Sequence, residues 1–485
     1  MAGQIVTDFS FKIFASACSI LCDENANRSL RTLSGDLGYV KGLYWRLPIN
    51  NLMTHADSTP LNIICLATYF KGGDFIRECK RLGCHVVLIT KEKMLHEEWP
   101  RDCIDQLMAV PNDAGPPLFI DLVAFLSREK KVDCVVALEE FDVMTAALIR
   151  EHFCLGGMNS STAKTFRDKL RMAVAAKEAG VELPDFVPLI SPAQIAEFIE
   201  RVPPPWILKP RSDVSAIGIR KLESRDEVWR AIEEMNEREN LRERSSYYLL
   251  ASFIAGEVFH VDSIVNHGRV IFAGANRYGR PPLEVAHQGG AYVSRTIEHG
   301  SADQKALFAA NKKLVKHLGL ERGAAHAEFI KSDVDGRFYF LEIAARVGGA
   351  YIAEVLEAAT GLNLWREWAR IEVAEMKAKQ QGQLSAAGGR RQDERAEVKR
   401  ASAVDRLEPE RKEYAGIVLS LAKQEHPDTE SYDDPEIVYR AKKRHHAGLI
   451  VRSKKLERVE ELISDYAVRF QQDFVAIVPP LEKAE

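Results

Sequence analysis

The chain has 485 residues, of which 46% are hydrophobic and 28% charged, and its formal net charge is -4. This composition excludes fibrous and disordered classes for most of the chain, and the length suffices for roughly three domains. The charge argues against binding to nucleic acid, and no apolar run is long enough to span a membrane. All eight cysteines lie in the first third without a CxxC pair, so we expect a cytoplasmic protein without a disulfide framework.

Residues 1–59 are interpreted as an N-terminal extension and residues 60–158 as a small open α/β domain. An apolar run within the extension lacks the positive flank of a secretory signal, so export is not expected. Alternating buried strands and helices after residue 60 predict a parallel sheet. The expected strands and helices are Ile63 to Ala67, about Gly73 to Leu82, His85 to Thr90, Val132 to Leu138 and Val143 to His152.

Two lysines and a loop of small residues follow, and a negative charge would stabilise each of them. Lys169 lies near the start of a helix, where a cation opposes the helix dipole unless solvent or an anion surrounds it. Lys209 ends a short strand, where burial is unfavourable without a fixed negative charge. In the segment Arg211 to Gly218, backbone N–H groups could approach phosphate oxygens. A plain hairpin with an exposed lysine is the alternative.

The middle of the chain combines a charged helix, two strands and a polar segment. The helix is expected over residues 223–245, and Tyr247 to Val265 is predicted to form two strands with Glu257 directly after the turn. Residues 274–300 are rich in Gly, Arg and His and lack apolar periodicity. They are predicted to form a long polar loop, which in a compact domain more often carries function than not. An amphipathic helix is expected over residues 301–318.

Two apolar-rich stretches surround Asp335-Gly336, a strong signal for a β-hairpin. If Gly336 closes a three-residue loop in the left-handed conformation, Asp333 pairs with Arg337. Glu328 then lies opposite Glu342. Like charges across a ladder repel each other, so we expect a cation between them, and oxygen ligands favour Mg2+ over Zn2+. Two glutamates that face water are the alternative.

The last part of the chain is predicted to contain a linker and a further domain. Residues 350–376 are expected to be helical, and the charged segment 377–411 is interpreted as a linker. Residues 412–485 are interpreted as a small C-terminal α+β domain. Its expected elements are Ala415 to Leu421, Ala447 to Val451, about Leu456 to Phe470 and Phe474 to Val478.

Together these features resemble the ATP-grasp superfamily over about residues 61–373. The most similar branch is the biotin-carboxylase-like one, which also contains amino-acid and dipeptide ligases. The resemblance implies an α/β and α+β multidomain fold. A Rossmann-like pre-ATP-grasp domain (60–158) would precede a two-subdomain ATP-grasp domain (159–376) and the small C-terminal α+β domain (412–485).

The resemblance implies ATP and Mg2+ as cofactors, with Mn2+ as an alternative ion. It assigns the metal to Glu328 and Glu342 and catalysis to Lys209 and Arg346. Where the family commonly has an asparagine ligand on the last strand, this chain has Ala344, which leaves one or two ions open. The residues that match nucleotide-binding positions are Lys169, Lys209, Ser212, Ser215, Gly218, Ser252, Phe253, Ile254 and Glu257.

The implied activity is that of an ATP-dependent carboxylate–amine ligase, which forms an amide through an acyl phosphate and releases ADP and phosphate. Arg277, Arg280 and His287 are candidates for binding a substrate carboxylate, with plain surface residues as the alternative. A biotin-carboxylase-like carboxylase is disfavoured, because Ala350 stands where that family has a glutamate base. A non-catalytic ATP-binding module is the second alternative. Small-molecule substrates are the expected partners, and a homodimer is compatible with the sequence.

Overall fold

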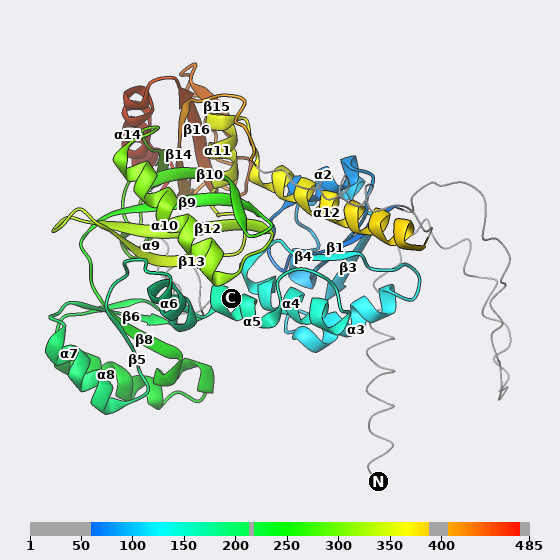
Figure 1. Cartoon of the computed structure of the whole chain (residues 1–485). Helices are drawn as coiled ribbons and strands as arrows, with labels where there is room; N and C mark the ends of the chain where they lie inside the picture. Colours follow the sequence, from blue (N-terminus) through cyan, green and yellow to red (C-terminus); the bar gives the residue numbers. More distant parts are fainter. Residues whose placement is uncertain (1–59, 213–217, 388–405, 476–485) are drawn as a thin grey trace, which may run out of the picture. The chain divides into compact units, whose positions relative to one another are not determined.

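The computed structural model describes residues 60–212, 218–387 and 406–475 (Figure 1). By its contacts the chain divides into two units, Met1–Ser58 and Thr59–Glu485, and every described residue lies in the second. The predicted N-terminal extension is therefore outside the described residues. One parallel and two antiparallel sheets, with helices between their strands, confirm the predicted fold class. Among the described residues, no helix is both long and apolar enough to cross a membrane.

A parallel sheet and its helices come first: β1 (Asn62–Leu66), α2 (Gly73–Arg81), β2 (His85–Lys91), β3 (Gln106–Val110), α3 (Pro116–Leu126), β4 (Cys134–Ala137) and α4 (Val143–His152). The strand order is β3-β2-β1-β4. Every residue of β1 is buried, as is typical of a parallel strand covered on both faces. The chain runs from β1 outward to β3 and returns to the other side of β1. The carboxyl ends of β1 and β4 therefore meet at a switch point, where open α/β sheets bind ligands.

A small antiparallel sheet with its helices follows: α5 (Ser160–Arg167), α6 (Lys169–Glu178), β5 (Phe186–Pro188), α7 (Pro192–Arg201), β6 (Trp206–Pro210), β7 (Arg220–Leu222), α8 (Arg225–Asn236) and β8 (Tyr248–Ser252). The strand order is β5-β8-β6-β7. Asn159 and Asp168 cap α5 and α6, because their side chains accept hydrogen bonds from first-turn backbone N–H groups. Helices α7 and α8 pack on the sheet around the fully buried Trp206.

The largest sheet and its helices use the rest of the described chain: β9 (Gly256–Asn266), β10 (Arg269–Tyr278), α9 (Pro282–Gln288), β11 (Tyr292–Thr296), α10 (Ala302–Leu318), β12 (Gly323–Ser332), β13 (Phe338–Ala344), α11 (Ile352–Thr360), α12 (Leu364–Ala387), β14 (Tyr414–Leu421), β15 (Ile437–Arg440), β16 (His446–Ser453) and α14 (Leu456–Asp473). The strand order is β13-β12-β9-β10-β11-β14-β16-β15. The C-terminal strands therefore extend this sheet through the β11–β14 pair, and the division into a separate C-terminal domain stays a prediction. Helix α14 packs on β14 and β16 (Figure 1).

Three further expectations need correction. Residues 274–300 are not a long loop but contain the end of β10, helix α9 and strand β11. The buried polar residues Asn276, Ser294 and Thr296 hide the strand pattern in the sequence. The helix predicted over 350–376 is two helices, separated where Gly361 adopts a left-handed φ of 84°. The linker predicted from residue 377 begins later, because α12 continues to Ala387 through residues that favour helix. Of the last predicted strand, the described part contributes only a bridge between Val475 and Ala422.

Candidate functional site

The hairpin of β12 and β13 places Glu328 directly opposite Glu342, as predicted. The pairing near the turn differs from the prediction, because Ser332 and not Asp333 pairs with Arg337. A β-bulge next to Glu328 adds one residue on β13 and restores the expected register. The two carboxylates therefore lie side by side on one face of the large sheet.

Lys169 and Lys209 lie beside this pair of glutamates. Lys169 Nζ is 3.0 Å from Glu342 Oε2, and the start of its helix is fixed because Arg211 binds the capping residue Asp168. Burial and the charge of Lys169 lower the pKa of Lys209 to about 8, whereas Glu342 acts to raise it. Two lysines near one carboxylate leave an excess of positive charge that a phosphate group would neutralise.

Arg346 comes from the same hairpin and is anchored to the parallel-sheet domain. Its Nε donates to Glu140 Oε2 at 3.0 Å, and its Nη1 donates to the carbonyl of Val347 at 3.0 Å. Arg167 Nη1 binds the other oxygen of Glu140 at 2.6 Å. Burial would raise the pKa of Glu140, but the adjacent Arg346 and Arg167 guanidinium groups lower it. The buried carboxylate therefore stays charged and holds the arginine in place.

Sequence reasoning missed the contribution of the parallel sheet to this site. Glu139 and Glu140 follow β4, and Lys71 follows β1, at the switch point of that sheet. Lys71 Nζ lies 2.8 Å from Glu139 Oε2, and burial together with Arg346 lowers the pKa of Lys71. Charged residues directly after two neighbouring buried strands are the signal that could have identified them.

The predicted nucleotide-binding residues occupy connections next to the small sheet. Ser212 and Gly218 flank residues 213–217, which contain Ser215 and lie outside the described residues. Gly218 has a φ of 70°, a conformation that favours glycine. Ser252 ends β8, and Phe253 and Ile254 connect it to β9. Phe253 is exposed, and Lys221 Nζ lies over its ring, 4.7 Å from the ring centroid.

Glu257 and Arg277 are not brought together with Glu328. The register pairs Glu328 with His260 and Lys331 with Glu257. Because successive side chains of a strand point to opposite faces, Glu257 lies on the face opposite Glu328. Its Oε1 binds Arg277 Nη1 at 2.6 Å. The ribose-binding and substrate-binding roles implied for these two residues stay predictions.

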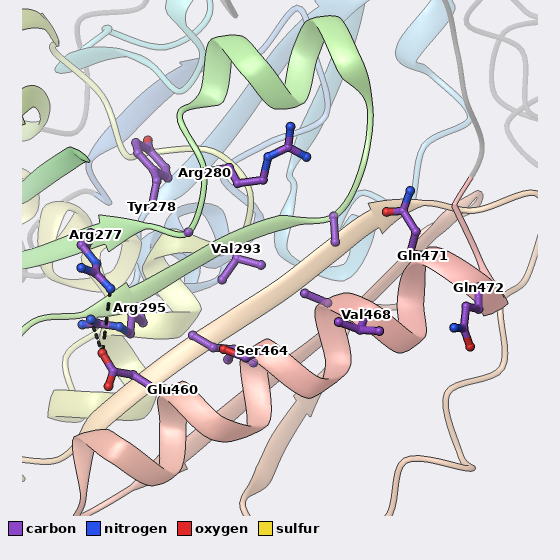
Figure 2. A pocket seen from close by; sticks show the side chains of 14 residues that line it. Arg277, Tyr278, Arg280, Val293, Arg295, Glu460, Ser464, Val468, Gln471 and Gln472 are labelled. Atoms are coloured by element: carbon purple, nitrogen blue, oxygen red, sulfur yellow. Dashed lines mark ion pairs between the residues drawn. The ribbon is translucent and has the colours of Figure 1, made fainter. Parts of the chain in front are cut away.

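A cavity of about 700 Å3 opens on that opposite face, between β10, β11 and α14 (Figure 2). Arg277 and Arg295 lie at one end, where both approach Glu460 of α14. Arg280, a second predicted substrate residue, also lines this cavity. The third, His287, belongs to α9, and its side chain lies outside the described residues. The cavity thus lies between residues of the segment 274–300 and helix α14, on the face of the sheet that does not carry Glu328 and Glu342.

A buried polar network lies behind Glu328 on its own face of the sheet. Asp262 accepts hydrogen bonds from Nδ1 of His260 at 2.6 Å and from Nδ1 of His326 at 2.8 Å. Tyr278 donates its hydroxyl to Glu328 Oε1 at 2.6 Å. Burial lowers the pKa of His326, but Asp262 and Glu328 together raise it, to about 9. Burial and the charge of Glu328 raise the pKa of Tyr278, which keeps the phenol protonated as a donor.

The donors at the hairpin fit a hard divalent cation. Glu328 and Glu342 offer only oxygen ligands, and the Glu342 side chain is 38% exposed, so an ion can reach it. Ala344 carries no donor. Ligand atoms of His260, Asp262 and His326 also lie within 4.8 Å of one another, but the hydrogen bonds among them occupy these atoms. The glutamate pair is therefore the better candidate for a metal.

Comparison with known proteins agrees with this arrangement. Residues 202–354 match the family model of the ATP-grasp domain. An L-arginine-specific L-amino acid ligase of Bacillus subtilis is 23% identical over 245 residues, which are 50% of this chain. The match spans only 58% of that relative's length.

Two solved structures share the fold of this chain. The L-amino acid ligase from Bacillus licheniformis is 17% identical with a TM-score of 0.61, covering 86% of this chain and 98% of that one. The biotin carboxylase domain of the Hydrogenobacter thermophilus 2-oxoglutarate carboxylase, a dimer in complex with MgADP, ADP and bicarbonate, is 16% identical with a TM-score of 0.58. That comparison covers 84% of this chain and 89% of the other.

Proposed function

The chain carries an ATP-grasp domain of the branch that includes L-amino acid ligases and biotin carboxylases, and from this premise we propose that it is an ATP-dependent carboxylate–amine ligase. ATP transfers its terminal phosphoryl group to a carboxylate oxygen of one substrate, which gives ADP and an acyl phosphate. An amine nitrogen of the second substrate then attacks the acyl carbon and loses a proton. Phosphate leaves, and an amide bond has formed.

The proposal rests on the convergence of three cations with two carboxylates. Lys169, Lys209 and Arg346 lie around the paired Glu328 and Glu342. Phosphoryl and acyl transfer ask the protein mainly to position the reactants and to neutralise developing negative charge. A site rich in fixed cations, without a nucleophile and base pair, is suited to this chemistry.

Glu328 and Glu342 would hold Mg2+ or Mn2+, and Ala344 leaves the number of ions at one or two. Such an ion supplies charge neutralisation at the phosphates of a bound nucleotide. The protein itself contributes positive charge through Lys169, Lys209 and Arg346. Glu140 holds Arg346 at a fixed position. The preorganised guanidinium can bind the transferred phosphoryl group without first being ordered.

The substrates we propose are small molecules, with an L-amino acid as the first choice for the carboxylate, because the related Bacillus ligases are named for L-amino acids. The described cysteines are free thiols, which agrees with the cytoplasmic location that we propose. A homodimer is also proposed, since one solved neighbour is a dimer.

The test is phosphate release from Mg-ATP by the purified protein, screened across pairs of L-amino acids and small carboxylates. Hydroxylamine is added in parallel, because it traps an acyl phosphate as a hydroxamate. We expect phosphate release that requires a carboxylate, and hydroxamate formation when the amine is omitted. Release that needs only bicarbonate and biotin would instead establish a carboxylase. ATP binding without turnover for any pair would establish a non-catalytic module.

A further inference from the structure

The polar side chains behind Glu328 form one continuous chain of hydrogen bonds and one ion pair across neighbouring strands. They share one face of the large sheet, because the register pairs His260 with Glu328 and Asp262 with His326. Apart from Glu328 itself, every member is less than 9% exposed. In order along the hydrogen bonds the members are Ser294, His260, Asp262, His326, Glu328 and Tyr278.

Asp262 fixes the orientation of His326. Its two oxygens are both used, since Oδ2 binds His260 Nδ1 and Oδ1 binds His326 Nδ1. A carboxylate that accepts from one ring nitrogen sets which way the other nitrogen points. The Nε2 of His326 accordingly faces Glu328 Oε1 at 3.4 Å.

Two side chains contact the same carboxylate oxygen of Glu328. Tyr278 donates to Oε1 at 2.6 Å, and His326 approaches Oε1 as well. Both contacts use the same oxygen of the carboxylate, which leaves Oε2 as the oxygen that can bind a cation. A carboxylate whose second oxygen is fixed loses less entropy when it binds a cation.

We propose that Asp262, His326 and Tyr278 are positioning residues that hold Glu328 Oε1 so that Oε2 is preset to bind the divalent metal ion. This inference rests on the proposed function, because it takes Glu328 as a metal ligand. No local sequence motif predicts this positioning of Glu328.

Gly348, in the turn that follows Arg346, packs against two of these positioning residues. A Cβ atom at this position would lie 2.9 Å from Asp262 Oδ1 and 3.0 Å from His326 Nδ1. Only a glycine lets the turn pack directly on that hydrogen bond. The turn after Arg346 therefore packs directly on the hydrogen bond between His326 and Asp262.

The test measures Mn2+ binding by the electron paramagnetic resonance signal of the free ion, at a fixed concentration of ADP and without turnover. We expect Tyr278→Phe and Asp262→Asn each to weaken Mn2+ binding by about 10- to 100-fold, as is typical for groups that orient a metal ligand. ADP binding without metal should stay unchanged. Ser294→Ala is the matched control, because it removes a hydrogen bond at the far end of the chain and should leave Mn2+ affinity within about twofold.

A second pair of variants distinguishes the loss of positioning from a general loss of structure. His326→Gln keeps an N–H donor near Glu328, whereas His326→Ala removes it, so the glutamine variant should regain much of the Mn2+ affinity. Saturating Mg2+ should restore turnover of Tyr278→Phe, because only the affinity for the ion is lowered.

Glu328→Gln distinguishes failure of this inference from failure of the proposed function. If this variant binds Mn2+ as well as the unmodified protein does, the metal assignment itself is wrong. If Glu328→Gln loses Mn2+ while Tyr278→Phe keeps it, the positioning role is overturned. Equal losses in Ser294→Ala and Tyr278→Phe would overturn it as well.

Discussion

The two faces of the large sheet hold their charged groups in different ways. Behind Glu328, polar side chains are buried and paired through a continuous chain of hydrogen bonds. On the opposite face, the ion pair of Arg277 and Glu257 is 31% and 53% exposed and borders an open cavity. Exposed ion pairs contribute about 0–1 kcal/mol, whereas breaking a buried pair costs about 3–5 kcal/mol. Burial of hydrogen-bonded polar groups, more than charge itself, therefore marks the face that we assign to chemistry.

The largest expected effect is on the face of the paired glutamates. Lys209→Ala and Glu342→Gln should each lower turnover by about 10²- to 10³-fold, because each removes a charged group from the centre of the site. Phosphate release measures the loss, and circular dichroism checks that the fold is intact. Lys312→Ala, which changes an exposed lysine of α10, is the control. Near-normal turnover in either site variant would remove the basis of the assignment.

The packing of Gly348 predicts the next effect. Gly348→Ala forces a methyl group against Asp262 and His326, and overpacking of this kind costs about 1–3 kcal/mol. Urea unfolding should show the loss in the free energy of unfolding. Gly349→Ala is the matched control, because its nearest neighbour would be Lys71 Nζ at 3.9 Å. If both alanines cost the same, the close approach at Gly348 is unimportant.

The lowered pKa of Lys209, about 8, predicts a pH dependence of nucleotide binding. Below this pH the ammonium is charged and attracts phosphate, and above it the charge is lost. Metal-free ADP should therefore bind more weakly at pH 9 than at pH 7, by at most about tenfold per pH unit above the pKa. Isothermal titration calorimetry measures the difference. Lys209→Arg stays charged at both pH values and should flatten the profile; an unchanged slope would assign the effect to another group.

The smallest effect is expected on the opposite face. Arg277→Ala breaks an exposed ion pair, so the free energy of unfolding should change by less than about 0.5 kcal/mol. Turnover should stay within about twofold. A fall as large as that of Lys209→Ala would show that both faces take part in the reaction, and it would support the substrate-binding role predicted for Arg277.

Local patterns were sufficient to predict the hairpin and most helices. The Asp335-Gly336 turn and the apolar strands around it lie next to each other in the chain, so the hairpin could be predicted from the sequence. The count reached the pairing of Glu328 with Glu342 because a β-bulge that the sequence did not reveal offsets a one-residue difference at the turn. Strand β11 could not be predicted, because buried Ser294, Arg295 and Thr296 hide the alternation of apolar and polar residues. Their polar groups are satisfied by tertiary partners, which a sequence pattern does not display.

The parts of the site that the sequence did not reveal depend on contacts between distant segments. Arg346 and Glu140 are 206 residues apart, and no spacing rule connects them. Polar residues stand at alternating positions in the middle of two strands, His260 and Asp262 in β9 and His326 and Glu328 in β12. This alternation, in which the buried side chains are the polar ones, is the local sequence pattern that indicates the buried network.

The pairing of β11 with β14 decides how this chain can be divided. The boundary between its nucleotide-handling part and its C-terminal part runs through a ladder of backbone hydrogen bonds. A chain cut after α12 would expose the edge of β11, and unpaired sheet edges promote aggregation. The smallest piece that keeps every strand of this sheet therefore extends to the end of β16, because β14, β15 and β16 belong to the same sheet as Glu328 and Glu342.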